Sequence, residues 1–180
     1  MAKLDQVEEM RAMSNTRTFA LGAAMMLLLA ACGGGTEPSD PNAGSETLEN
    51  GMTVRAQIEA RQEGYKAIGR NFKTINDQLK TSAPDIPEIQ TAAAAMVEAS
   101  EGMLDWYPAG TGPDSGVKTE ALATIWDEPE DFALKVSEYE AALATLAAAT
   151  TSGDLEAIAA AARATGPTCG ACHDKYRLDD

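Results

Sequence analysis

Apolar residues recur along four stretches of the chain at the spacing of an α-helix. In the first stretch, residues 54–79, they come at alternating steps of four and three, and Arg61 and Tyr65 share their register. Such steps place side chains on one face of a helix that packs nearly parallel or antiparallel to its neighbours. Three further stretches continue the pattern: residues 86–107, 132–146 and 155–176. The sequence therefore predicts an all-α fold, an antiparallel up-down-up-down four-helix bundle.

Prolines and acidic residues mark where these helices are expected to begin and end. The first helix should stop near Pro84, because proline disfavours a helical residue before it. The third is expected to take Asp127 as its N-cap, with Pro129 tolerated in its first turn. Inside the fourth, Pro167 removes one backbone hydrogen bond and crowds the preceding turn, which predicts a kink or a restart of the helix. The longest connection between helices is residues 111–128.

The charge of the chain narrows the classes of partner. Its 180 residues include 28 acidic and 14 basic ones, a formal net charge of −14. A field of that sign repels nucleic acids and anionic lipid, so no nucleic-acid partner is expected. The length allows one domain with a real core. The acidic surface favours basic redox partners that are met transiently.

The N-terminal residues are expected to lie outside the bundle. Phe19 to Ala31 form an apolar run of thirteen residues, which fits the core of an export signal and is too short to span a bilayer. The run ends in LAAC, which resembles the lipobox of bacterial lipoproteins, where cleavage precedes a cysteine that then carries lipid. An ordinary signal peptide with a coincidental cysteine is the alternative. We expect residues 1–31 to be a signal peptide, with a lipid anchor on Cys32 and a periplasmic location.

Between the signal and the bundle, residues 32–50 are rich in Gly, Pro, Ser and acids and have no apolar periodicity. Such a composition is typical of a flexible tether, so the helical domain is expected to span residues 51–180. If Cys32 carries lipid, the two remaining cysteines, Cys169 and Cys172, belong to one motif. No pair is then left for a structural disulfide.

The chemistry is concentrated near the C-terminus, in Cys169, Cys172 and His173 of the sequence CGACH. Thiols at i and i+3 lie on one side of a helix and can form thioether bonds to the two vinyl groups of a haem; the following histidine then ligates the iron. A structural zinc site would need four ligands, and the chain has no second Cys/His pair. A thioredoxin-type redox pair should follow a strand, and no strand is readable. The motif therefore predicts one covalent haem c.

With this motif near its C-terminus, the sequence resembles the class II c-type cytochromes, above all cytochrome c′. Three segments carry the resemblance besides CGACH: ARQEGYKAIGRNF, IWDEPEDF and the final helix TSGDLEAIAAAARATGPTCGACHDKYR. It covers residues 51–178, and Trp126 and Phe132 stand at the family's spacing before the third helix. No methionine follows His173, which excludes the class I arrangement with its downstream methionine ligand.

The resemblance implies roles for three residues of the first helix. Low-spin class II cytochromes bind the iron through a methionine four residues after an arginine, and high-spin members have a non-ligating side chain there. Counted from Arg61, that position is Tyr65. A neutral phenol is a poor ligand for ferrous iron, so we expect a five-coordinate haem with His173 as its proximal ligand and Tyr65 covering the other face. Arg61 is expected to bind a haem propionate, with Gln62 beside the same edge.

Other interpretations of these residues stay open. From helical spacing alone Tyr65 is a core aromatic, and Arg61 can extend its guanidinium to the end of the bundle. A sixth iron ligand could come from Met52, Met96 or Met103, although methionine more often fills a core.

The expected function is electron transfer, binding of a small gas such as nitric oxide or carbon monoxide, or both. An apolar distal face with few hydrogen-bond donors would favour small neutral ligands. The alternatives are a low-spin cytochrome that only transfers electrons, a peroxidase-type enzyme and a haem-free helical lipoprotein. A peroxidase usually needs a distal histidine or arginine, and the chain has a single histidine, so we do not expect an enzyme. The resemblance also implies a homodimer through the first two helices, although their outer faces show no second apolar stripe.

The N-terminus supplies a first test. Mass spectrometry of the mature protein should find a chain that begins at Cys32 and carries acyl groups on that residue. Two or more acyl chains would hold the protein firmly at a membrane, whereas one would not. A free Cys32, or cleavage at another position, would contradict the lipoprotein assignment.

Overall fold

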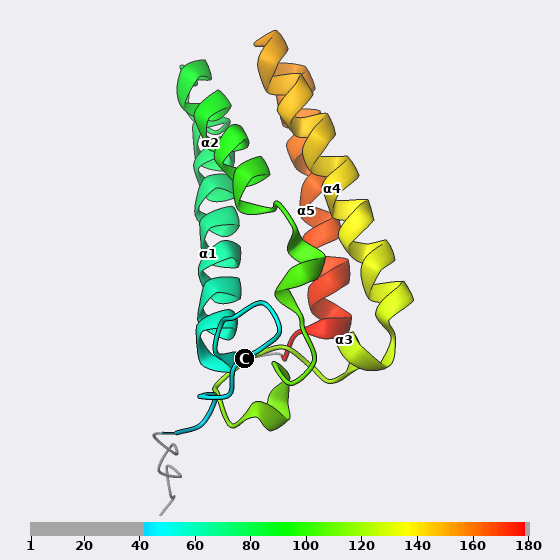
Figure 1. The fold of residues 1–180 in the computed structure, drawn as a ribbon. Helices are drawn as coiled ribbons and strands as arrows, with labels where there is room; N and C mark the ends of the chain where they lie inside the picture. The colour runs from blue at the N-terminus through cyan, green and yellow to red at the C-terminus, as the bar shows by residue number, and fades with distance from the viewer. Residues whose placement is uncertain (1–41, 179–180) are drawn as a thin grey trace, which may run out of the picture. The chain divides into compact units, whose positions relative to one another are not determined.

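The computed structural model describes residues 42–178, which form a helical bundle (Figure 1). Its elements are α1 (Val54–Gln78), α2 (Ile86–Ala99), the short 3₁₀ helices η1 (Met103–Trp106) and η2 (Pro113–Ser115), α3 (Thr124–Asp127), α4 (Pro129–Ser152) and α5 (Leu155–Tyr176). The four long helices alternate in direction, which confirms the predicted up-down-up-down arrangement. No helix within the described residues has the length and apolar character needed to cross a membrane. The predicted signal peptide and Cys32 lie outside the described residues.

The segment before α1 includes part of the predicted tether, residues 32–50. Its described part, residues 42–50, is bound to the start of α1: the backbone N–H of Arg55 donates to the Gly44 oxygen at 2.9 Å, and the Arg55 guanidinium donates to the Ala43 oxygen. Leu48 packs against a small apolar cluster that includes Val54. Composition does not reveal these contacts, because the acceptors are backbone oxygens, which every residue type has. Residues 42–50 are therefore attached to α1, whereas residues 32–41 lie outside the described residues.

The second helix is shorter than its apolar stripe predicted. It ends at Ala99 instead of continuing to Tyr107, because Gly102 adopts a left-handed conformation with φ of 63°, where the chain leaves the helix. The Ser100 hydroxyl donates to the Met96 oxygen at 2.8 Å in the last turn. Met103 in η1 is still buried. The apolar pattern therefore continues through a change of backbone conformation.

Two predictions about proline and capping also need correction. Asp127 is the last residue of α3 and does not cap α4; Glu128 precedes that helix without a side-chain capping bond, while Pro129 occupies the first turn as predicted. The helix α5 does not restart at Pro167 but runs through it. Pro167 is exposed, so its ring faces solvent while the opposite side of α5 packs on α4.

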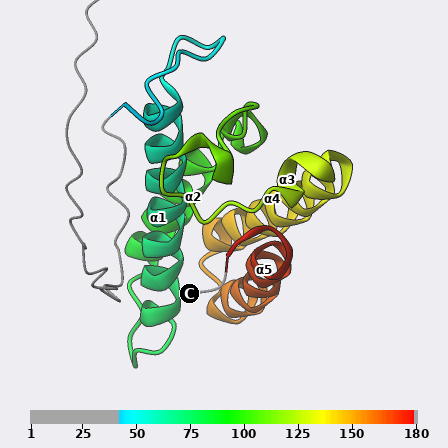
Figure 2. The same cartoon turned by 90° about the horizontal axis from the view of Figure 1, so that it is seen from below.

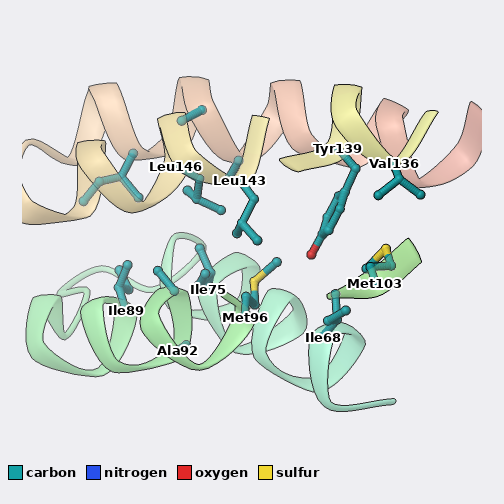
Figure 3. Packing of buried hydrophobic residues seen from close by; sticks show 14 of the residues in the cluster. Ile68, Ile75, Ile89, Ala92, Met96, Met103, Val136, Tyr139, Leu143 and Leu146 are labelled. Atoms are coloured by element: carbon teal, nitrogen blue, oxygen red, sulfur yellow. The ribbon is translucent and has the colours of Figure 1, made fainter. Parts of the chain in front are cut away.

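The core lies where two helix pairs meet. The helix α1 packs along α2, α5 packs along α4, and α2 packs against α4. Figure 2 shows the two pairs on opposite sides of the molecule. Ile75, Ile89 and Leu146, one each from α1, α2 and α4, are fully buried in this core (Figure 3). Because α2 and α4 make the contact between the pairs, α1 and α5 are left to form the walls of a site.

Substitution of two leucines on α4 tests this packing. Leu146 is 0% exposed and Leu134 is 54% exposed. Leu146→Ala should lower the free energy of unfolding by about 2–5 kcal/mol, because it leaves a cavity in the core. Leu134→Ala should change it by no more than about 0.5 kcal/mol. Urea denaturation measures both, and equal losses would contradict the placement of α4.

Candidate functional site

A cavity of about 730 Å³ lies against α1, α4, α5 and residues 118–121 of the long connection. Its inner wall is apolar, with Ile68 and Phe72 from α1 and Phe132 and Val136 from α4. Six residues that the sequence singled out all line it: Arg61, Gln62, Tyr65, Cys169, Cys172 and His173. The fold therefore brings the first and last helices together around one site.

The helix α5 supplies the reactive groups of one wall. Cys169 and Cys172 are half-buried free thiols. Burial raises the pKa of both, that of Cys172 to about 11, so both stay protonated at neutral pH. Desolvation and the positive charge of Arg177 lower the pKa of His173. Neutral imidazole is the form that binds a metal, so this wall offers two thiols and one metal ligand.

Arg61 of α1 is buried, with 3% of its surface exposed, and binds the connection between α2 and α3. Its Nη1 donates to the Trp106 oxygen at 3.3 Å and to Thr111 Oγ1 at 3.2 Å; its Nη2 donates to the Thr111 oxygen and to Thr119 Oγ1, both at 3.0 Å. The sequence did not predict this structural role. Four of the five N–H donors are thereby used, which leaves Nε–H for the predicted propionate contact.

Tyr65 of α1 lines the cavity together with Tyr107, and both belong to a group of packed aromatic rings. Its hydroxyl oxygen lies 2.8 Å from that of Tyr107, and its ring packs edge-to-face on Trp106 with centroids 5.2 Å apart. Tyr107 packs in turn on Phe132 at 4.8 Å, and its backbone oxygen accepts a hydrogen bond from Trp126 Nε1 at 3.0 Å. The predicted apolar distal face therefore also carries two phenol hydroxyls, which are hydrogen-bonded to each other.

Sequence reasoning gave Tyr107 no role in the site. It lies at the end of the second apolar stripe, and its partner Tyr65 is 42 residues earlier, so no local spacing connects the two. Of the three methionines considered as iron ligands, Met103 lines the cavity, whereas Met52 and Met96 do not.

The rim of the cavity is polar where α1 meets the long connection. Gln62 Nε2 donates to the Lys118 backbone oxygen at 3.2 Å, and Arg177 Nε lies 3.0 Å from a carboxylate oxygen of Glu120. An apolar interior with cations at its edge suits a flat apolar macrocycle that carries carboxylates. The two thiols and the imidazole add the groups that attach and ligate such a molecule. The residues present therefore fit a covalently bound haem.

Comparison with known proteins agrees with this geometry. The sequence model of the family described as Cytochrome C′ matches residues 56–177. The chain belongs to the cytochrome c′ family. Among its relatives, cytochrome c-554 of Cereibacter sphaeroides is 30% identical over 134 residues, which cover 73% of this chain and 100% of that protein. Family membership implies covalently bound haem c and confirms the four-helix bundle.

Solved structures of the family superpose on this fold. A cytochrome c′ described by an unusual ligand-controlled dimer dissociation is 30% identical, with a TM-score of 0.68 over 72% of this chain and 99% of that one. A nitric oxide complex of a cytochrome c′ variant from Alcaligenes xylosoxidans is 25% identical, with a TM-score of 0.64 over 71% and 97% of the two chains. The similarity therefore extends over nearly all of each relative.

A substitution at Arg61 tests its structural role. Arg61→Ala leaves the Trp106 and Thr111 carbonyls without these donors and should lower the free energy of unfolding by about 3 kcal/mol. The control is Arg70→Ala, an exposed arginine of the same helix, which should change it by no more than about 0.5 kcal/mol. Urea denaturation measures both. Equal effects would show that the guanidinium does not hold the connection in place.

Proposed function

We propose that this chain is an exported c-type cytochrome with one haem c, attached by thioethers to Cys169 and Cys172 and ligated by His173. We further propose that it binds a small gas such as nitric oxide or carbon monoxide, transfers electrons, or both. The observation that carries the proposal is that one cavity receives both thiols and the imidazole from α5 and a tyrosine from α1. A covalent haem, which family membership implies, would use the thiols for attachment and the imidazole as a ligand.

The proposed haem is five-coordinate. The position where low-spin relatives place a methionine carries Tyr65, whose pKa burial raises far above its ordinary value. The phenol therefore stays neutral and is a poor ligand for ferrous iron. Met103 also lines the cavity, which keeps a six-coordinate, low-spin cytochrome for electron transfer as the second candidate.

The chain's own residues prepare the site for a small ligand. Phe132, Val136 and Ile68 keep one side of the cavity apolar and exclude water. When bound, the haem supplies the iron that takes up the gas or the electron. A relative captured as a nitric oxide complex supports the gas-binding part. The single histidine is His173, which leaves no second imidazole for acid–base catalysis, and we propose that the protein is not an enzyme.

The proposed location is the periplasm, with the domain held at a membrane by lipid on Cys32. The apolar run before Cys32 and the export that c-type cytochromes require support this location. Periplasmic redox proteins with basic surfaces would complement the net charge of −14. The ligand-controlled dimer of one relative supports a homodimer as a further proposal.

Optical and spin-state spectra of the holoprotein test this function. The oxidised and reduced protein should be high-spin, and carbon monoxide should shift the ferrous spectrum. Tyr65→Met should move the haem toward low spin and weaken carbon monoxide binding, because the thioether would occupy the sixth position.

The matched control is Tyr65→Leu, which removes the phenol without adding sulfur and should stay high-spin. A low-spin wild type with no carbon monoxide shift would contradict the five-coordinate proposal and favour methionine ligation. An unchanged spectrum in Tyr65→Met would show that residue 65 does not lie above the iron.

A further inference from the structure

Tyr65 and Tyr107 both line the cavity, and their hydroxyls are hydrogen-bonded to each other. This bond uses one of the two hydroxyl protons, so the other proton is left. We propose that Tyr65 and Tyr107 form a polar subsite that donates one hydrogen bond to a small molecule bound in the cavity. This rests on the proposed function and adds to it the chemical class of the preferred ligand, a hydrogen-bond acceptor.

The two hydroxyls carry two protons, and one hydrogen bond joins their oxygens. Burial raises the pKa of Tyr107 to about 12 and that of Tyr65 still further, so each hydroxyl carries its proton at neutral pH. The two oxygens lie 2.8 Å apart, so one proton is shared between them. Within residues 42–178, neither hydroxyl makes a second hydrogen bond. The other proton is therefore available to a ligand in the cavity.

Another tyrosine of the same cavity shows the opposite arrangement. The Tyr139 hydroxyl lies 3.0 Å from Ser100 Oγ, and Ser100 donates its own proton to the Met96 oxygen at 2.8 Å. The Tyr139 proton must therefore go to Ser100, and no proton is left over. Figure 3 shows Tyr139 reaching from α4 toward Met96. The spare proton is thus a feature of the Tyr65–Tyr107 pair and not of cavity tyrosines in general.

The two phenols differ in acidity, and this difference decides which hydroxyl keeps the free proton. Burial raises the pKa of Tyr65 more than that of Tyr107, and the hydrogen bond between them together with the Arg61 charge, whose guanidinium carbon lies 4.6 Å from the centre of the Tyr107 ring, lowers the pKa of Tyr107. The more acidic phenol is the better donor, so Tyr107 donates to Tyr65. The Tyr65 proton is then the one that a ligand receives.

The surrounding rings hold this donor in one orientation. Trp106 packs against Tyr65, and Phe132 packs against Tyr107, each edge-to-face. A donor fixed in this way needs little reorganisation when an acceptor arrives. Ligands that accept a hydrogen bond well, such as bound nitric oxide or dioxygen, should therefore gain more from the pair than carbon monoxide does.

Infrared spectroscopy of the ferrous carbon monoxide complex tests the proposal. A hydrogen bond to bound carbon monoxide lowers its C–O stretching frequency, so the frequency should rise in Tyr65→Phe, which removes the donor. It should rise less in Tyr107→Phe, which keeps the donor but removes the hydrogen bond that polarises it. The matched control is Tyr139→Phe, which loses a hydroxyl with no spare proton and should keep the wild-type frequency. The ratio of nitric oxide to carbon monoxide affinity should also fall about tenfold in Tyr65→Phe, the effect of one hydrogen bond.

The outcomes separate this subsite from the proposed function. Wild-type frequencies in both Phe variants would overturn the subsite and leave gas binding intact. A shift confined to Tyr65→Phe, or an equal shift in Tyr139→Phe, would overturn the role of the pair. A wild type that takes up no carbon monoxide would overturn the gas-binding part of the proposed function and the subsite with it. If Tyr65→Phe does not fold by circular dichroism, Tyr107→Phe decides the question.

Discussion

The site depends on one buried cation. Arg61 has 3% of its surface exposed, and its terminal N–H groups are used by oxygens of Trp106, Thr111 and Thr119. A buried guanidinium is costly unless its donors are satisfied, so the connection has to lie against α1 for the charge to be tolerated. The same connection carries Tyr107. The hydrogen bonds of Arg61 therefore also hold the segment that places Tyr107 in the cavity wall opposite α5.

The contact between the helix pairs lies away from the cavity. Contact between α2 and α4 makes the core continuous, and the fully buried Leu146 lies there, away from the cavity. The last turns of α5 therefore carry the two thiols and the imidazole of the site, and α1 carries Arg61 and Tyr65.

The repeating pattern of apolar residues was enough to predict the bundle and the direction of its helices, because helix packing repeats at the spacing of the sequence. The motif and the resemblance placed six side chains that all line one cavity. The features that the sequence did not predict depend either on local backbone geometry or on contacts between distant parts of the chain. The end of α2 depends on the positive φ of Gly102, and the contacts of residues 42–50 are backbone hydrogen bonds that composition does not reveal. Tyr107 was missed because its partner lies 42 residues away.

A tyrosine at position 65 is intelligible only together with its neighbours. It offers no sulfur to the iron, but it brings a hydroxyl into an apolar cavity, where an unpaired polar group is costly. Tyr107 supplies the hydrogen-bond partner, and Arg61 both orders the segment that carries Tyr107 and polarises its ring. Replacing the tyrosine by an apolar residue would remove the need for the partner, and with it the donor. The three side chains are therefore best understood as one unit, in which a structural cation sets the polarity of a ligand cavity.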